Sequence, residues 1–239
     1  EIQDTGSYRP MQNDDLQAIQ DMETAVKERP ILFSAPMVRA ILAGQKTQTR
    51  RVVKAGLQPD EWLDRCQYNA KGWAVNNDEG CDCKHGVSCP YGEIGDRLWV
   101  REAWSIVPHV TEDGPKNKAK GDGTGVTWRA AWDGNPSGFK WKPSIHMPRW
   151  ASRINLEIVG VDVERLQNIS FNDAIAEGIL QTSDESVTDR TWLDYSGLGV
   201  SWTKFPIHSY RTLWESINGS GSWDSNPWVW VIEFKKLSP

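Results

Sequence analysis

The chain lacks several features that would have decided its class at once. None of its apolar runs is long enough to cross a bilayer, and the N-terminal residues EIQDTGSYRP do not form a signal peptide. A positive charge excess is also missing, since the formal net charge is −5. This charge argues against a protein that coats nucleic acid through bulk electrostatics. We therefore expect a cytoplasmic protein with no membrane partner.

Tyrosine and phenylalanine are scarce, with five of each, whereas tryptophan occurs 14 times. Tryptophan stacks on bases and sugars, but it also fills hydrophobic cores. One small site cannot use all of these indole rings, so most of them must be structural. The excess of tryptophan does not by itself identify a ligand.

Cysteine is also scarce, yet three of the four cysteines crowd into one short segment. Cys81, Cys83 and Cys89 lie in CDCKHGVSC together with His85, and Cys66 is the fourth thiol. In a cytoplasmic chain, such crowding indicates a metal before a disulfide. The C-x-C-x5-C spacing differs from the paired C-x2-C knuckles of common zinc sites. A structural zinc site and a loop of reduced thiols therefore both stay open, and we expect no other cofactor.

Acidic residues are absent from residues 29–59, although they outnumber basic residues over the whole chain. The run is explained either by a solvated face or by a local phosphate-binding patch on an otherwise acidic protein. Its six basic residues are Arg29, Arg39, Lys46, Arg50, Arg51 and Lys54.

The order of the predicted elements favours one α+β domain. Residues 1–27 form a polar extension with a possible amphipathic helix, and residues 28–239 form the domain, with insertions near 56–92, 105–148 and 181–204. Alternating apolar residues predict strands in KTQTRRVV, RLWVREAW, RINLEIVGV and PWVWVIEF, beside a short buried strand at ILF and another in TWRAAW. Short strands with interspersed helices fit a mixed β-barrel and do not fit a βαβ parallel sheet.

Three helices are predicted within this domain. The first follows Ser34 and ends at Gly44, and the second starts with a capping box of Ser170 and Asp173 and stops at Gly178. The third lies in SYRTLWESING, with one apolar stripe. That stripe consists of Tyr210, Leu213, Trp214 and Ile217.

The segment AILAGQKTQTRR carries the most chemistry, because Lys46 and Thr49 directly follow the end of the first helix. Threonine is a poor nucleophile unless a neighbouring group accepts its proton. A lysine whose pKa is lowered by desolvation can accept that proton, and a nearby carboxylate can orient the lysine. Lysine and threonine occur at this spacing by chance very often, so the pair alone is a weak signal.

Several motifs together resemble the ASCH domains of the PUA-like class. They are GQKTQTRR after the helix, GDRLWVRE at residues 95–102, and INLEIVGV leading to ERLQNIS. The resemblance runs from about residue 30 to residue 234, and CPYGEIGDRLWVREAW, PSIHMPRWASRI and NPWVWVIEF most resemble ASCH proteins encoded by tailed phages and prophages. It implies a PUA-like mixed β-barrel with short flanking helices and long loop insertions. Its cleft would take RNA or a modified base, in the host cytoplasm if a phage encodes it.

One branch of this family, the small bacterial N4-acetylcytidine amidohydrolases, uses a Lys-x-x-Thr pair and a glutamate on a later strand. By that resemblance, Thr49 attacks the acyl carbon, Lys46 activates Thr49, and Glu157 holds Lys46. Another branch resembles ribonucleases, in which the basic loop faces phosphate. The candidate nucleic-acid contacts are then Arg39, Lys46, Arg50, Arg51 and Arg101.

Three functional classes stay open. The first is a binding module for RNA or a modified nucleoside, and the second is an amidohydrolase that uses Lys46, Thr49 and Glu157. The third is a phage accessory or assembly protein that uses the fold as a scaffold for a protein partner. Structural roles compete with each assignment: Lys46 and Arg50 are then solvated residues, and Glu157 pairs across strands with an arginine such as Arg101.

Overall fold

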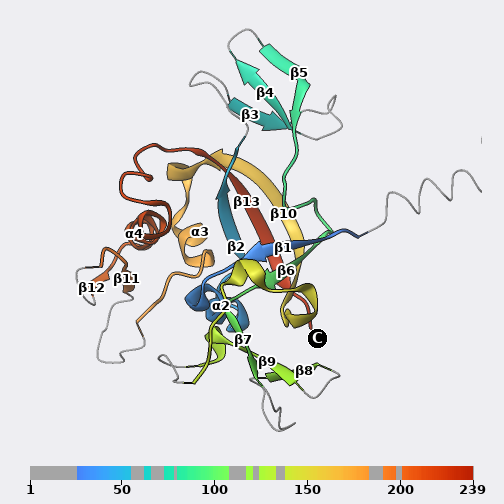
Figure 1. Cartoon of the computed structure of the whole chain (residues 1–239). Helices are drawn as coiled ribbons and strands as arrows, with labels where there is room; N and C mark the ends of the chain where they lie inside the picture. The colour runs from blue at the N-terminus through green and yellow to red at the C-terminus, as the bar shows by residue number, and fades with distance from the viewer. Residues whose placement is uncertain are drawn as a thin grey trace, which may run out of the picture.

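A computed structural model shows a mixed α+β protein with much sheet and few helices (Figure 1). It describes residues 26–54, 62–65, 73–77, 80–107, 117–120, 124–132, 138–182, 191–197 and 201–238. The amphipathic helix expected before residue 26 lies outside these ranges. None of the helices within them is long and apolar enough to cross a bilayer.

A five-stranded sheet forms the centre of the molecule. In hydrogen-bonding order its strands are β1 (Glu28–Leu32), β6 (Arg97–Arg101), β10 (Asn155–Arg165), β13 (Trp228–Lys236) and β2 (Gln48–Val52). Strands β1 and β6 run parallel, and the other neighbours are antiparallel. The residues of each strand fall in or next to a segment that was predicted to be extended. The α+β class predicted from the sequence is therefore confirmed.

The sheet does not close into a hydrogen-bonded barrel within the described residues, because β1 and β2 remain its two edges. The edges nevertheless come close: Arg51 on β2 donates from Nη2 to the carbonyl oxygen of Leu32 on β1, at 3.0 Å. Just beyond β1, the ring of Phe33 packs on Phe234 of β13, with centroids 6.1 Å apart. Side chains thus join the edges where a closed barrel would have a backbone ladder.

Three short helices pack beside this sheet. Helix α2 (Ala35–Leu42) follows β1, and Gly44, which ends the predicted helix, has a positive φ of 74°. Helix α3 (Phe171–Ala176) begins with the predicted capping box: Ser170 Oγ accepts from the amide of Asp173, and the Asp173 carboxylate accepts from the amide of Ser170.

Helix α4 (Pro206–Asn218) begins three residues before the predicted segment, because Pro206 suits the first turn of a helix. Tyr210, Leu213 and Trp214 are buried as the apolar stripe predicted. Ile217 on the same stripe is 66% exposed, so it lies beyond the core.

Each of the three predicted insertions carries strands of its own. The first contains β3 (Trp62–Arg65), β4 (Trp73–Asn77) and β5 (Gly80–Val87), which project beyond one end of the central sheet in Figure 1. At the other end, β7 (Trp104–Val107), β9 (Thr124–Trp128) and β8 (Asn117–Lys120) form another three-stranded sheet. The third insertion contributes the pair β11 (Trp192–Asp194) and β12 (Ser201–Thr203) beside α4.

In the described part of the chain, four short 3-10 turns link these elements: η1 (Arg129–Ala131), η2 (Ser144–His146), η3 (Arg149–Ala151) and η4 (Leu166–Asn168). The first of them corrects the strand predicted for TWRAAW, of which only Thr127 and Trp128 belong to β9. The strand ends there because the chain turns back, and the amide of Arg129 donates to the carbonyl of Ala103 at 2.8 Å.

The main core contains side chains from the central sheet and from α2, α3 and α4. Leu98, Leu156 and Ile158 are fully buried on the sheet face that their alternation predicted. Burying such a side chain contributes about 1.5–3 kcal/mol. The indole of Trp230 packs edge-on against Trp73 at 5.7 Å. Trp192, Trp214 and Trp223 lie in the same core, in line with a structural role for many tryptophans.

Candidate functional site

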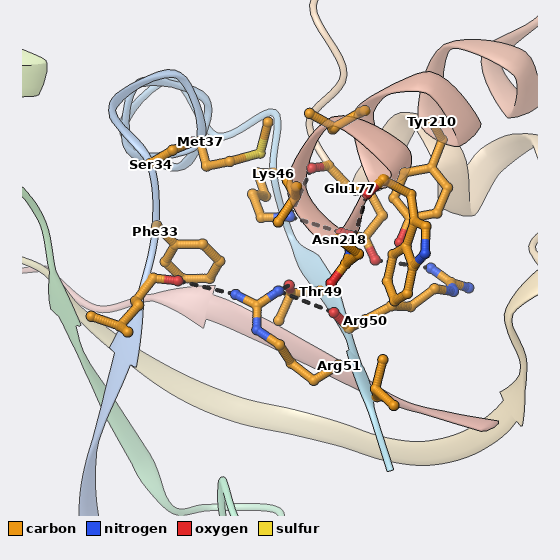
Figure 2. Close-up of a pocket in the computed structure, with 15 residues that line it drawn as sticks. Phe33, Ser34, Met37, Lys46, Thr49, Arg50, Arg51, Glu177, Tyr210 and Asn218 are labelled. Atoms are coloured by element: carbon orange, nitrogen blue, oxygen red, sulfur yellow. Dashed lines mark hydrogen bonds and ion pairs between the residues drawn. The ribbon is translucent and has the colours of Figure 1, made fainter. Parts of the chain in front are cut away.

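A cavity of about 290 Å³ opens among residues from β1, α2, β2 and α4 (Figure 2). Its volume lies at the lower end of the roughly 300–1,000 Å³ typical of small-molecule sites. The polar residues that line it are Ser34, Lys46, Thr49, Arg50, Arg51, Glu177, Tyr210 and Asn218. The apolar ones are Leu32, Phe33, Met37, Val52, Leu213, Trp214 and Ile217.

Lys46 is buried in the polar part of this cavity and uses all three of its ammonium hydrogens. Its Nζ donates to the carbonyl oxygens of Gln48 (2.8 Å) and Glu177 (2.7 Å) and to Oε2 of Glu177 (2.9 Å). Burial lowers the pKa of Lys46 below its ordinary value, and the Glu177 carboxylate counters part of that effect. The amine is thus paired, yet easier to deprotonate than an exposed lysine.

Glu177 reaches Lys46 because α3 ends at this point. The helix stops with Glu177 at its C-cap, and Gly178 continues with a positive φ of 79°. A Cβ on Gly178 would lie 2.7 Å from Cβ of Lys46, so only glycine permits this close approach. The amide of Thr47 also donates to the carbonyl of Ala176 at 2.9 Å. The start of β2 is therefore fixed against the end of α3.

Thr49 lies on β2, two residues from Arg51, so both side chains leave the same face of the strand. Arg51 Nη1 donates to the Thr49 hydroxyl oxygen at 2.8 Å (Figure 2). A hydrogen bond from a guanidinium group favours negative charge on the oxygen that accepts it. This contact therefore suits a hydroxyl that has to lose its proton.

The two neighbouring arginines of this strand differ in their partners. Arg50 is buried, and its guanidinium contacts carboxylate oxygens of Glu164 (2.6 Å), Glu177 (3.2 Å) and Asp173 (3.7 Å). Arg51 is partly exposed, and no carboxylate in the described part of the chain pairs with it. The charge of Arg50 is already compensated inside the protein, so this arrangement does not favour the phosphate contact predicted for it. Arg51 is the cation that remains available to an anion.

Tyr210 brings a hydroxyl group into the same cavity from α4. Burial, reinforced by the negative charge of Glu177, raises the pKa of Tyr210 well above 10. The phenol therefore stays protonated and can act only as a neutral hydrogen-bond group. Within the described ranges, no protein hydrogen bond engages it.

The predicted partner of Lys46 has to be corrected. Glu157 does not line the cavity: it lies on β10, and its Oε1 pairs with Nζ of Lys235 at 2.9 Å. Its neighbours Leu156 and Ile158 face the core, so the alternation of the strand turns Glu157 to the opposite face. Glu177 makes the contact instead. The sequence signal for it is a glutamate directly before Gly178, the residue that ends α3.

The other candidate nucleic-acid contacts lie away from the cavity. Arg39 is exposed on α2. Arg101 donates from Nε to the carbonyl of Met147 at 3.0 Å, and its guanidinium lies over the ring of Trp99 at 5.0 Å. Neither arginine lines the cavity that holds Lys46.

The predicted zinc site lies largely outside the described residues, which include neither Cys66 nor the side chains of Cys81, Cys83 and His85. Cys89 is described, and it is a half-buried free thiol whose pKa is raised by burial. The described residues contain no group of three or more potential ligands that could hold a metal ion. The zinc site stays a prediction.

Comparisons with known proteins assign no function to this cavity. No family model matches the chain, and no curated protein or solved structure matches it. The arrangement of Lys46, Thr49, Arg51 and Glu177 is therefore the observation from which a function has to follow.

Proposed function

We propose that the cavity binds an acylated nucleobase or nucleoside and hydrolyses its exocyclic amide, with Thr49 as the nucleophile. The observation that carries this proposal is the convergence of Lys46, Thr49 and Glu177 in one cavity, although Glu177 follows Lys46 by 131 residues. The resemblance to ASCH amidohydrolases supplies the substrate class, N4-acetylcytidine and related N4-acylcytosines. In that assignment Glu177 takes the role that the sequence suggested for Glu157.

The first half of the reaction forms an acyl-threonine ester. The neutral amine of Lys46 takes the hydroxyl proton while Oγ of Thr49 bonds to the acyl carbon. The carbonyl oxygen becomes an oxyanion, which the uncompensated charge of Arg51 and the Tyr210 hydroxyl are suited to stabilise. The C–N bond then breaks, and the Lys46 ammonium returns its proton to the leaving nitrogen.

Water completes the hydrolysis in the second half. Lys46 takes a proton from the attacking water, whose oxygen bonds to the acyl carbon. The bond between that carbon and Thr49 Oγ then breaks, and the Lys46 ammonium returns the proton to Thr49 Oγ. The products are a carboxylic acid, which ionises, and the free exocyclic amine. Glu177 holds Lys46 through Oε2, while Arg50 holds the other oxygen of the same carboxylate. Arg50 is thereby a positioning residue.

The size and charge of the cavity favour a nucleoside over a polymer at this position. A space of about 290 Å³ suits one base with a small substituent. Of the two neighbouring arginines on β2, only Arg51 has no carboxylate partner among the described residues, so only Arg51 is available to bind a phosphate. RNA binding by this cavity without turnover, and a role as a protein scaffold, are the two alternatives that the experiment has to separate.

The experiment measures conversion of N4-acetylcytidine to cytidine together with binding of the nucleoside. Thr49→Val keeps the shape of the side chain but removes the nucleophile, so we expect a loss of at least about 10³-fold in kcat with binding retained. The rate of the wild-type protein should rise with pH through the pKa of Lys46, which lies below 10.5. Binding without turnover would make the protein a reader of modified bases, and neither binding nor turnover would favour a scaffold.

A further inference from the structure

A second segment of the chain carries only positive charges, although the chain as a whole is negative. Residues 134–156 contain no aspartate or glutamate, whereas the protein as a whole has a net charge of −5. The segment carries four arginine or lysine residues and two tryptophans. These residues are Lys140, Trp141, Lys142, Arg149, Trp150 and Arg153.

The cations of this region lie against its aromatic rings, and two of the rings contact each other. We use the name Trp–Arg surface for Trp99, Trp104, Trp141, Lys142, Arg149 and Trp150. Arg149 lies over the ring of Trp99 at 5.8 Å, and Lys142 lies over Trp104 at 4.8 Å. The rings of Trp104 and Trp150 meet edge-on at 6.4 Å.

The backbone holds this arrangement in place. Trp104 on β7 and Lys142 exchange backbone hydrogen bonds in both directions, at 3.2 Å and 2.7 Å. Arg129, next in line, places its guanidinium over Trp141 at 5.8 Å. Aromatic rings and cations thus alternate along segments that are distant in the sequence.

Part of the Trp–Arg surface is open to solvent. Trp150 is 40% exposed, and Lys142 is exposed as well. Glu28 pairs with Arg149 at 3.0 Å, but no carboxylate in the described part of the chain pairs with Lys142. None of the six residues lines the cavity of Lys46.

We propose that the Trp–Arg surface binds single-stranded nucleic acid, with a phosphate on Lys142 and a base on the exposed ring of Trp150. Positive charge beside aromatic platforms is the combination that single-strand-binding proteins use, because every base has a face that can stack. A duplex hides those faces within its own stack. This site is independent of the cavity and of its proposed hydrolysis.

The test measures binding of the full chain to fluorescein-labelled oligo(dT) and oligo(U) of about 12 nucleotides, within the span of known single-strand sites. A duplex of the same length and poly-glutamate serve as competitors. We expect both single strands to bind at low salt, with an affinity that falls steeply as salt rises. The duplex and poly-glutamate should compete at least tenfold less well than an unlabelled single strand.

Four variants locate the site. Trp150→Ala should weaken binding by roughly 5- to 100-fold, whereas Trp150→Phe, which keeps a ring, should weaken it much less. Lys142→Glu should weaken binding and flatten its salt dependence. Lys54→Glu, an exposed charge reversal in the acid-free residues 29–59, is the matched control and should bind like wild type.

Three results would overturn the proposal: no binding by the wild-type protein at low salt, equal losses in Lys54→Glu and Lys142→Glu, or equal competition by poly-glutamate. Unfolding curves of Trp150→Ala show whether its weaker binding results from a destabilised fold. If the fold is destabilised, the binding of Trp150→Phe tests the role of the ring instead. The binding assay does not depend on turnover of N4-acetylcytidine. A failure of the Trp–Arg surface to bind nucleic acid is therefore distinguishable from a failure of the hydrolase proposal.

Discussion

Two lysine–glutamate ion pairs of this protein have the same length and opposite surroundings. Lys46 and Glu177 are separated by 2.9 Å, as are Lys235 and Glu157. The side chains of the first pair are 2% and 5% exposed, and those of the second pair are 59% and 30% exposed. The first pair lines the cavity, whereas the second pair joins two neighbouring strands of the central sheet.

The surroundings of an ion pair, and not the distance between its charges, decide what the pair does. Water screens the exposed pair, so it adds little to stability. The buried pair has lost its hydration, so each charge depends on its partner and on the hydrogen bonds around it. In the buried pair, the Glu177 carboxylate therefore acts directly on the pKa of Lys46.

The largest expected effect is the loss of stability when one member of the buried pair is removed. Glu177→Gln leaves Lys46 without its carboxylate and takes one partner from Arg50 as well, so we expect a loss of about 3–5 kcal/mol. Urea unfolding monitored by tryptophan fluorescence measures it. Glu157→Gln is the matched control and should cost less than about 1 kcal/mol. Equal losses in both variants would show that burial does not set the contribution of these ion pairs.

A third ion pair, of intermediate burial, should have an intermediate effect. Asp96 accepts from Arg29 at 2.7 Å and from the amides of Lys27 and Glu93. Burial acts to raise the pKa of Asp96, but these hydrogen bonds outweigh it and the pKa is lowered. We expect Asp96→Asn to lose about 1–2 kcal/mol of unfolding free energy at neutral pH.

The lowered pKa of Asp96 also fixes the pH dependence of that loss. A carboxyl whose pKa is lower in the folded state stabilises the fold above the unfolded pKa, near 3.8, and stops doing so as the pH falls through the folded pKa. The difference between wild type and Asp96→Asn should therefore be full at pH 7 and shrink below pH 3.8. Thermal unfolding across this range checks it, and a constant difference would contradict the role of the charge.

The smallest effect is expected for salt acting on the exposed pair. At high ionic strength, charges near the surface are screened within a few ångströms, so the contribution of Lys235 and Glu157 should vanish. A double-mutant cycle of these two residues at low and high salt measures that coupling, which should be about 0.5 kcal/mol at most. A coupling energy that persists in high salt would show that dissolved ions do not screen this pair, despite its exposed side chains.

Much of the fold could be predicted from the sequence because local rules determine it. Alternation places Leu98 and Leu156 in the core. The capping box of Ser170 and Asp173 places the start of α3 at Phe171. The position of Ile217 was misjudged because a helical stripe predicts a shared face, but not where the core under that face ends.

The site was only half predictable for a related reason. Lys46 and Thr49 lie three residues apart, so their meeting is a local matter. The carboxylate partner of Lys46 is set by where α3 ends in space. The alternation of β10 argues against Glu157, but neither spacing nor periodicity points to Glu177 instead. The pairing of Arg50 with distant carboxylates was hidden for the same reason, since a run of basic residues says nothing about what the rest of the chain brings to it.

The role of Glu177 is tested by comparing kcat/KM for N4-acetylcytidine in Glu177→Gln and Glu157→Gln. If Glu177 controls the proton of Lys46, its loss should lower kcat/KM by roughly 10²-fold, in the range of general acid–base contributions. The rising limb of the pH profile should also shift to lower pH, because the carboxylate raises the pKa of Lys46. Glu157→Gln should match wild type in both respects. A wild-type rate and pH profile in Glu177→Gln, or a loss of similar size in Glu157→Gln, would contradict the account.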